Sequence, residues 1–151
     1  MIANCSWVRG IYLGLEYARV TGNGIIDAPG PAGILLSRAN HAILSNNVIR
    51  RSTGHGIKFF ESNDVLIEGN QILQSSAASV FFSGISVQDN SNRNNIRGNI
   101  FRRGGSDTRH GVILFNGADG NIIDSNDLRD GSLQAPVSDA GTNTVLSGNV
   151  V

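Results

Sequence analysis

Residues 56–72 read GIKFFESNDVLIEGNQI and hold both halves of a motif that recurs along the chain. The first half is a glycine followed by an alternating apolar pattern, here GIKF. The second half is built on Asn70, with an apolar residue three positions before it (Ile67) and another two positions after it (Ile72). Alternation with a period of two residues indicates short β-strands, so each copy of the motif predicts at least two of them.

Both halves of the motif return at a regular spacing, with steps of 23, 23, 28 and 27 residues between the glycines. The glycines that begin the first half are Gly10, Gly33, Gly56, Gly84 and Gly111. The asparagines of the second half are Asn23, Asn47, Asn70, Asn99, Asn126 and Asn149. All six have an apolar residue at positions −3 and +2 and Gly, Asn or Ser at −1. A period of about 23 residues with two or three short strands is typical of one coil of a solenoid, whose coils stack about 4.8 Å apart.

The repeat predicts an all-β fold in one domain over residues 1–151, a parallel β-helix of about six coils with 23–28 residues each. Apolar side chains at −3 and +2 would then line one interior, and we expect Leu44, Ile67, Ile96 and Ile123 to form a single buried row. We expect the asparagines to stack as a ladder that holds a bent backbone and passes amide hydrogen bonds between coils.

The composition limits the classes of partner. The 151 residues carry 12 basic and 12 acidic side chains, and only 16% are charged, against about 25% in an ordinary soluble domain. A net charge of zero argues against nucleic acid and against an anionic membrane surface. No apolar run approaches the roughly 18 residues of a membrane span. The single cysteine, Cys5, excludes an intrachain disulfide and a cysteine-based zinc site.

The paired pattern of Gly-Ile and Φ-x-Gly-Asn-x-Φ, where Φ is apolar, resembles the right-handed parallel β-helix repeat over about residues 10–151. That repeat occurs in pectate lyases, polygalacturonases, alginate C5-epimerases and phage tailspike depolymerases. The resemblance implies an acidic polysaccharide as substrate or ligand and an extracellular or virion-associated location. Gly54 to Ile57 is similar to the Gly-His-Gly-Ile stretch of polygalacturonases, but their other catalytic motifs and the Asp-Pro-His-Asp motif of the epimerases are missing.

The two ends lack capping helices, which predicts either that flanking parts of a longer protein cover the solenoid or that it forms a homo-oligomer. The last coil has Pro136 where the alternating strand should begin, and proline cannot donate to a ladder. This strand is therefore expected at a sheet edge. Residues 1–5 show no signal-peptide pattern.

Alignment of the coils puts Arg38, Glu61, Asp89 and Asn116 at one position, five residues after each glycine. Glu61 and Asp89 would then lie on adjacent coils about 5 Å apart. Two such carboxylates could act as a catalytic pair or ligate a hard cation such as Ca²⁺, although no cofactor is required. Lys58 is expected to project outward, where it could bind a uronate carboxylate or act as a base. The alternative is a solvated row in which Arg38 pairs with Glu61.

Two longer segments separate the middle coils, and insertions in repeat proteins often lie where they bind a ligand. In the first, Phe81 and Phe82 could stack on sugar rings. In the second, Asp107 to His110, Arg109 could bind a carboxylate in a bidentate manner. We interpret His55 and His110 as surface turn residues, with a catalytic role for His110 as the alternative.

Two functions remain open from the sequence. The first is a carbohydrate-interacting protein that binds or acts on an acidic polysaccharide as a lyase, hydrolase or epimerase, with Glu61, Asp89, Lys58 and His110 as catalytic candidates. Phe82, Arg109 and Arg38 would then bind the substrate. The second is a noncatalytic solenoid module for assembly or adhesion.

Overall fold

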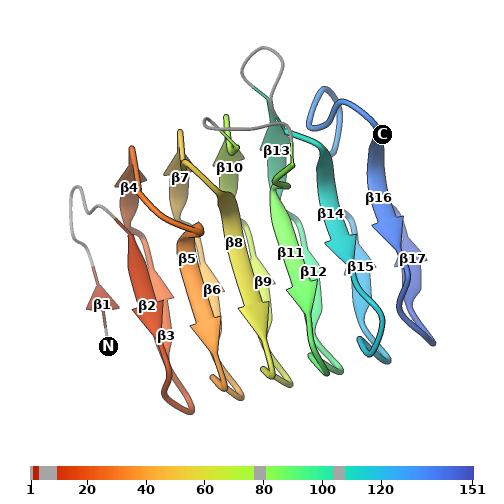
Figure 1. Cartoon of the computed structure of the whole chain (residues 1–151), viewed down its shortest axis with the longest axis horizontal. Coiled ribbons are helices and arrows are strands. Elements are labelled where there is room, and N and C mark those ends of the chain that lie inside the picture. The colour runs from red at the N-terminus through yellow and green to blue at the C-terminus, as the bar shows by residue number, and fades with distance from the viewer. Residues whose placement is uncertain (1, 4–9, 77–80, 104–107) are drawn as a thin grey trace.

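The chain folds into a parallel β-solenoid (Figure 1). The computed structural model describes residues 2–3, 10–76, 81–103 and 108–151, and none of these residues is helical. Successive strands run along one coil and then stack on the equivalent strands of the next coil, which gives three parallel sheets.

Each sheet collects the equivalent strands of successive coils, and the four-stranded sheet lacks strands from the last coils. The six-stranded sheet contains β2 (Ile11–Leu13), β5 (Ala32–Ser37), β8 (His55–Phe60), β11 (Ile85–Gln88), β14 (His110–Leu114) and β16 (Ala135–Asp139). The seven-stranded sheet contains β1 (Ile2–Ala3), β3 (Arg19–Thr21), β6 (Ile43–Ser45), β9 (Leu66–Glu68), β12 (Asn95–Arg97), β15 (Ile122–Asp124) and β17 (Val145–Ser147). The four-stranded sheet contains β4 (Gly24–Ile26), β7 (Val48–Arg50), β10 (Gln71–Leu73) and β13 (Ile100–Arg102).

Neighbouring coils are in register without slippage. Ile34 of β5 pairs with Ile11 on one side and with Ile57 on the other, and the same correspondence continues to β16. The chain makes about five turns of about 24 residues. The predicted all-β solenoid is confirmed, and the longer steps between Gly56 and Gly111 change the turns without changing the strand register.

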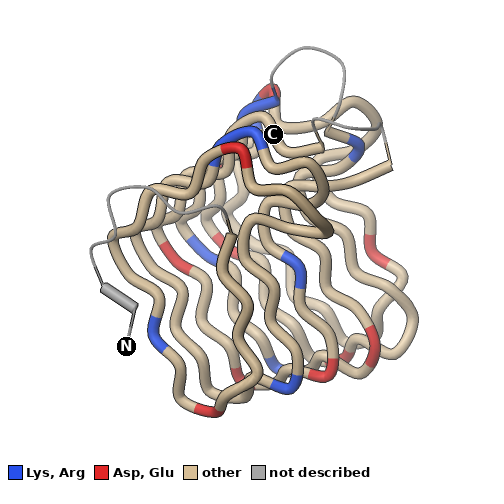
Figure 2. Tube along the Cα trace, turned by 60° about the vertical axis from the view of Figure 1, so that its left-hand side comes forward, with Lys and Arg blue, Asp and Glu red and all other residues tan. Residues whose placement is uncertain are grey.

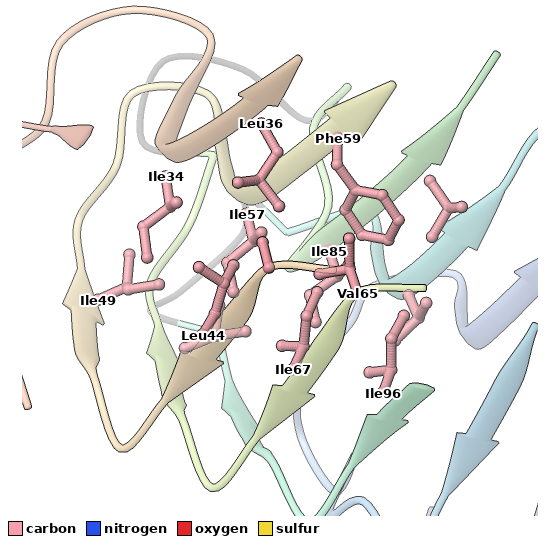
Figure 3. Close-up of a cluster of buried hydrophobic side chains, with 14 of the residues drawn as sticks. Ile34, Leu36, Leu44, Ile49, Ile57, Phe59, Val65, Ile67, Ile85 and Ile96 are labelled. Carbon is pink, nitrogen blue, oxygen red and sulfur yellow. The ribbon is translucent and has the colours of Figure 1, made fainter. Parts of the chain in front are cut away.

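The core lies between the sheets and consists of the apolar rows that the motif predicts (Figure 3). Leu44, Ile67, Ile96 and Ile123 of the seven-stranded sheet are fully buried, as expected. They meet the inward side chains of the six-stranded sheet, such as Phe59. Full burial of an aliphatic side chain contributes about 1.5–3 kcal/mol, so these rows are the main source of stability.

Close packing requires the glycine near the start of four strands of the six-stranded sheet: Gly33, Gly56, Gly84 and Gly111. A Cβ on Gly84 would come within 2.6 Å of Phe101 Cδ1 in the four-stranded sheet and within 2.6 Å of the Gly111 carbonyl oxygen. Only a residue without a side chain lets the two sheets approach this closely.

The coil turns sharply wherever a residue takes a left-handed backbone. Arg38, Glu61 and Asp89, five residues after the strand glycines, have φ values of 56°, 49° and 43°. The residues one position before the ladder asparagines do the same: Gly22, Asn46, Gly69, Gly98, Ser125 and Gly148. So do the residues six positions before them: Tyr17, His41, Asp64, Arg93, Gly120 and Asn143. Glycine meets this demand at eight described positions, whereas most of the asparagines serve elsewhere: of those described, only Asn46, Asn90 and Asn143 have a positive φ.

The six predicted ladder asparagines stack along one corner and are hydrogen-bonded in series. The backbone N–H and the Nδ2 of Asn70 both donate to Oδ1 of Asn99, at 2.9 and 3.0 Å. Asn70 Nδ2 also donates to the carbonyl oxygen of Leu44. The same pattern links each asparagine from Asn23 to Asn149 to the next one. The predicted asparagine ladder is therefore confirmed. Its bonds from one asparagine to the next all donate toward the C-terminal coil, while each Nδ2 from Asn47 onward also donates to a carbonyl oxygen of the preceding coil.

A second polar column, which the sequence analysis missed, occupies the turn between the six- and seven-stranded sheets. The backbone N–H of Asn63 donates to Oδ1 of Asn40, and that of Asn92 donates to Oδ1 of Asn63. Asp119 N–H continues the column by donating to Asn92 Oδ1. Its donors point toward the N-terminal coil, opposite to those of the asparagine ladder.

The C-terminal coil is open. Leu146 occupies the position of the buried Ile123 in the preceding coil, yet it is 52% exposed. Strand β16, which contains Pro136, lies at the edge of its sheet as expected. The core rows thus end in an apolar surface at this edge.

Candidate functional site

Most candidate residues lie on or beside the outer face of the six-stranded sheet. Because side chains alternate along a strand, the residue two positions after each strand glycine points away from the core. These outward residues form one row in register, which we call the Lys58 row: Tyr12, Leu35, Lys58, Ser86, Ile113 and Ser138. Lys58 is half-buried within it, and the row contains no carboxylate.

The predicted carboxylates lie at the ends of the strands. Glu61 follows β8 and Asp89 follows β11, and both are exposed. The backbone N–H of Glu61 donates to the carbonyl oxygen of Asp89 at 2.8 Å, so the two residues occupy adjacent coils as expected. Arg38 Nε lies 2.5 Å from Glu61 Oε2, which is the ion pair that the solvated-row alternative predicts. We call these three residues the carboxylate corner.

The interpretation of His55 as a surface turn residue is wrong. His55 is the first residue of β8 and only 6% exposed. Its Nδ1 accepts a hydrogen bond from the backbone N–H of Ser83 at 3.0 Å, and the Phe82 ring packs edge-on against it at 5.1 Å. Burial, together with the charge of Lys58, lowers the pKa of His55 to about 4. The ring is therefore neutral at pH 7, with its proton on Nε2.

His110, two coils away, is likewise buried in a strand, β14, so its interpretation as a turn residue is also wrong. Its Nδ1 lies 3.3 Å from the carbonyl oxygen of Ala135 and not against a backbone N–H as in His55. Burial lowers its pKa, and the nearby charge of Arg109 adds to the shift. Arg109 donates its backbone N–H to the Phe82 carbonyl and its Nε to Gln134 Oε1. The structure thus joins Phe82 and Arg109, whereas Asp107 lies outside the described residues.

The predicted site residues divide into two groups at opposite ends of the strands. The first is the carboxylate corner. The second, which we call the histidine end, contains His55, Phe82, Arg109 and His110. Six residues of chain, from His55 to Glu61, separate the ends, or about 20 Å at about 3.3 Å per residue. His110 therefore cannot share one reacting atom with Glu61 or Asp89, and Lys58 lies between the two groups.

Many of the other charged residues lie at or near the turns (Figure 2), and several of them form ion pairs between or within coils. Arg51 makes a bidentate pair with Asp27, and Arg102 and Arg129 both bind Asp127. These guanidinium groups, Arg129 foremost, hold the pKa of Asp127 well below its usual range. In contrast, no ion pair joins Lys58 to a carboxylate of the described residues.

Within the described residues no three His, Cys, Asp or Glu side chains lie close enough together to hold a metal ion. A cation at the carboxylate corner would need oxygen ligands beyond Glu61 and Asp89, such as backbone carbonyls or water. In the part of the chain that the structure describes, no helix is long and apolar enough to cross a membrane.

Sequence analysis missed Tyr12 as a functional candidate. Its side chain is 66% exposed, and it stands in register with Leu35, at the N-terminal end of the Lys58 row. The signal was present in the repeat, because Tyr12 lies two residues after Gly10 just as Lys58 lies two residues after Gly56.

Known structures resemble this arrangement of coils. The chain superposes on the A-module of the mannuronan C-5 epimerase AlgE6 from Azotobacter vinelandii with a TM-score of 0.71 and 17% identity, covering 99% of this chain and 49% of that module. For the AlgE4 A-module from the same organism the TM-score is 0.59 and the identity 16%, and the match covers 91% of this chain and 44% of that module. For a protein from Parabacteroides merdae assigned as a glycosyl hydrolase the TM-score is 0.64 and the identity 11%, and the match covers 95% of this chain and 81% of that one.

At these identities the likeness concerns the fold, and the chain spans about half the length of the epimerase modules that it matches. No curated protein matches the chain in sequence. The profile of the family described as the right-handed beta helix region matches residues 2–151. Together with the stacked coils and the asparagine ladder, this match shows that the chain belongs to the right-handed β-helix family.

Proposed function

We propose that this protein binds an acidic polysaccharide along the outer face of its six-stranded sheet. The observation that carries the proposal is the half-buried Lys58, which lies in the middle of an outward row without a carboxylate, while the arginines of the carboxylate corner and the coil turns are paired. A lysine without an acidic partner on a largely uncharged surface favours an anionic ligand.

The surroundings of Lys58 suit a carbohydrate. Aromatic rings lie on the same sheet or beside it, with Phe60 next to Lys58 along β8 and Phe82 at the histidine end. Arg109, directly before β14 at the histidine end, adds a second cation four residues along the chain from Ile113 of the Lys58 row. The solved structures that this chain resembles include mannuronan C-5 epimerase modules, which supports an acidic sugar as the ligand.

The binding proposal is tested by titration calorimetry with polymannuronate, polyguluronate and polygalacturonate at low and high salt. We expect wild-type binding that weakens with salt, because a charge–charge contact is screened. Lys58→Met should remove most of the binding. The matched control is Arg97→Met, which removes a cation that Glu68 already neutralises on the seven-stranded sheet. Equal affinities of wild type and Lys58→Met would contradict the proposal.

Catalysis at the carboxylate corner is the second candidate, favoured by the adjacency of Glu61 and Asp89 on successive coils. Adjacent carboxylates could serve as an acid and nucleophile pair, or bind Ca²⁺ as part of a substrate site. The double variant Glu61→Gln, Asp89→Asn should then abolish turnover and any Ca²⁺-dependent binding while leaving the fold intact. Turnover is followed by ultraviolet absorbance of unsaturated products, by reducing ends and by proton NMR of the C5 configuration. Full activity in the double variant would exclude this corner.

The noncatalytic assembly module remains the competing function. It predicts that neither binding nor turnover is found with any of these polymers, and that the exposed apolar edge at Leu146 instead mediates association, which light scattering detects.

A further inference from the structure

A small hollow opens beside Tyr12 at the N-terminal end of the Lys58 row. Its volume is about 250 Å³, and it is lined by Gly10, Ile11, Tyr12, Pro29, Pro31, Ala32 and Leu35. Apart from the tyrosine hydroxyl, none of these side chains is polar. Tyr12 is 66% exposed although it stands on a regular strand, so its ring offers a free aromatic surface to whatever enters the hollow.

The hollow continues the face on which Lys58 lies. Tyr12 pairs in register with Leu35, and Leu35 pairs with Lys58. Two coil steps therefore separate Tyr12 from Lys58, or about 10 Å along the solenoid axis. This is comparable to the advance of an extended polysaccharide over two successive sugar units. A chain that places one carboxylate at Lys58 therefore brings the ring two units further along over the hollow, so at least three units are needed to reach both.

We propose that the hollow is a subsite for one pyranose ring of an acidic polysaccharide, with Tyr12 stacked on the apolar C–H face of that ring. The inference rests on the proposed function and extends it to residues that carry no charge. The negative face of an aromatic ring attracts the weakly positive C–H hydrogens of a sugar. The carboxylate of the bound sugar would point out of the hollow, because no residue that lines the hollow is a cation.

The shape of the hollow limits what it can take. Its volume lies just below the range of about 300–1,000 Å³ for sites that enclose drug-sized ligands, which suits a single sugar ring. Pro29 and Pro31 have fixed φ angles, so this wall needs little ordering when a ligand binds.

The test uses oligouronates of defined length with the whole chain. Tyr12→Ala should weaken hexasaccharide binding about tenfold, the loss of one aromatic contact, while Tyr12→Phe keeps wild-type affinity. Tyr17→Ala is the matched control, since Tyr17 is 71% exposed but stacks on His41 at a turn. Tyr17→Ala should leave the affinity for the hexasaccharide unchanged. A disaccharide, too short to reach from Lys58 to the hollow, should bind wild type and Tyr12→Ala equally.

A direct readout is available because the chain has only two tyrosines. In carbon–proton NMR of tyrosine-labelled protein, hexasaccharide should shift the ring signals of Tyr12 and leave those of Tyr17 in place. If the wild type binds and Lys58→Met does not, but Tyr12→Ala binds like wild type and its signals stay unmoved, the subsite is excluded and the proposed function stands. If the wild type binds no oligouronate, both are overturned.

Discussion

Each inner ladder asparagine forms hydrogen bonds to the coils on both of its sides. Asn70 Oδ1 accepts from the backbone N–H and the Nδ2 of Asn47, at 3.0 and 2.9 Å, and its own two donors bind Asn99. Asn149, at the open end, accepts from Asn126 in the same way but is only half-buried. The two asparagines therefore make similar bonds in different surroundings.

We predict that Asn70→Ala destabilises the protein more than Asn149→Ala. A buried polar group that loses its partner costs about 1–3 kcal/mol, and Asn70→Ala deprives donors on Asn47 of their acceptor inside the stack. At the open end, water and fraying reduce the loss. Thermal unfolding of both variants checks this, and equal melting temperatures would argue against a stabilising ladder.

The buried His55 predicts a pH dependence of stability. Its folded pKa of about 4 lies below the ordinary value of 6.5, so the unfolded chain takes up a proton as the pH falls from 6.5 to 4 while the folded chain does not. The free energy of unfolding should therefore fall through this window, by roughly 3 kcal/mol in total, and no further below it. Above pH 6.5 His55 makes no pH-dependent contribution.

His55→Asn provides the control for this prediction, because the amide oxygen of asparagine can accept the Ser83 N–H but cannot be protonated in this range. The difference between the urea-unfolding free energies of wild type and His55→Asn should vary with pH only between about 4 and 6.5. A constant difference across pH 3–8 would show that His55 titrates normally in the folded protein.

Strands and turns are the scale at which the sequence analysis succeeded best. The recurring spacing of glycines such as Gly56 and asparagines such as Asn70 was enough to predict strands, register and the buried rows. The glycine permits close packing and the asparagine bonds the turn in one coil after another. The second polar column was missed because it is not constant along the chain: Asn40, Asn63 and Asn92 are followed by Asp119 in the next coil.

The histidine prediction failed for a related reason. Glycines on both sides of His55 are typical of a turn. Here, however, the position of Gly56 admits no side chain because the sheets approach closely, and the strand already begins at His55. The contact between Phe82 and His55 also could not be predicted, since Phe82 belongs to one of the longer segments between coils, which the repeat does not describe.

The close approach of the sheets predicts the effect of adding one methyl group. Gly84→Ala should cost about 1–3 kcal/mol, because its Cβ would overlap Phe101 and the Gly111 carbonyl. Gly98→Ala is the control, with φ at 60° and no heavy atom within 4 Å of the new Cβ. It should cost only the left-handed strain of about 1–2 kcal/mol. Chemical denaturation that ranks Gly98→Ala as the more damaging would contradict the packing explanation.

Over the whole molecule, stability should decline from the middle coils toward the open C-terminal coil. Ile67→Ala removes a fully buried side chain and should cost about 2–5 kcal/mol. Leu146→Ala, at the equivalent position of the last coil, removes one that is 52% exposed and should cost much less. Hydrogen exchange should likewise be faster in β17 than in β9. Uniform protection of these two strands would mean that the edge is covered in solution.

The opposed directions of the two polar columns have a consequence for how such a chain changes over generations. The asparagine ladder donates toward the C-terminal coil, whereas Asn63 and Asn92 donate toward the N-terminal coil. Each middle coil therefore offers its neighbours the same complementary donors and acceptors as the coil before it. Duplication or deletion of one whole period in the gene would preserve the backbone pairing and the asparagine ladder across the new junction, although not the ion pairs that join particular coils, such as Arg38 and Glu61. The Lys58 row could then lengthen or shorten by single coils.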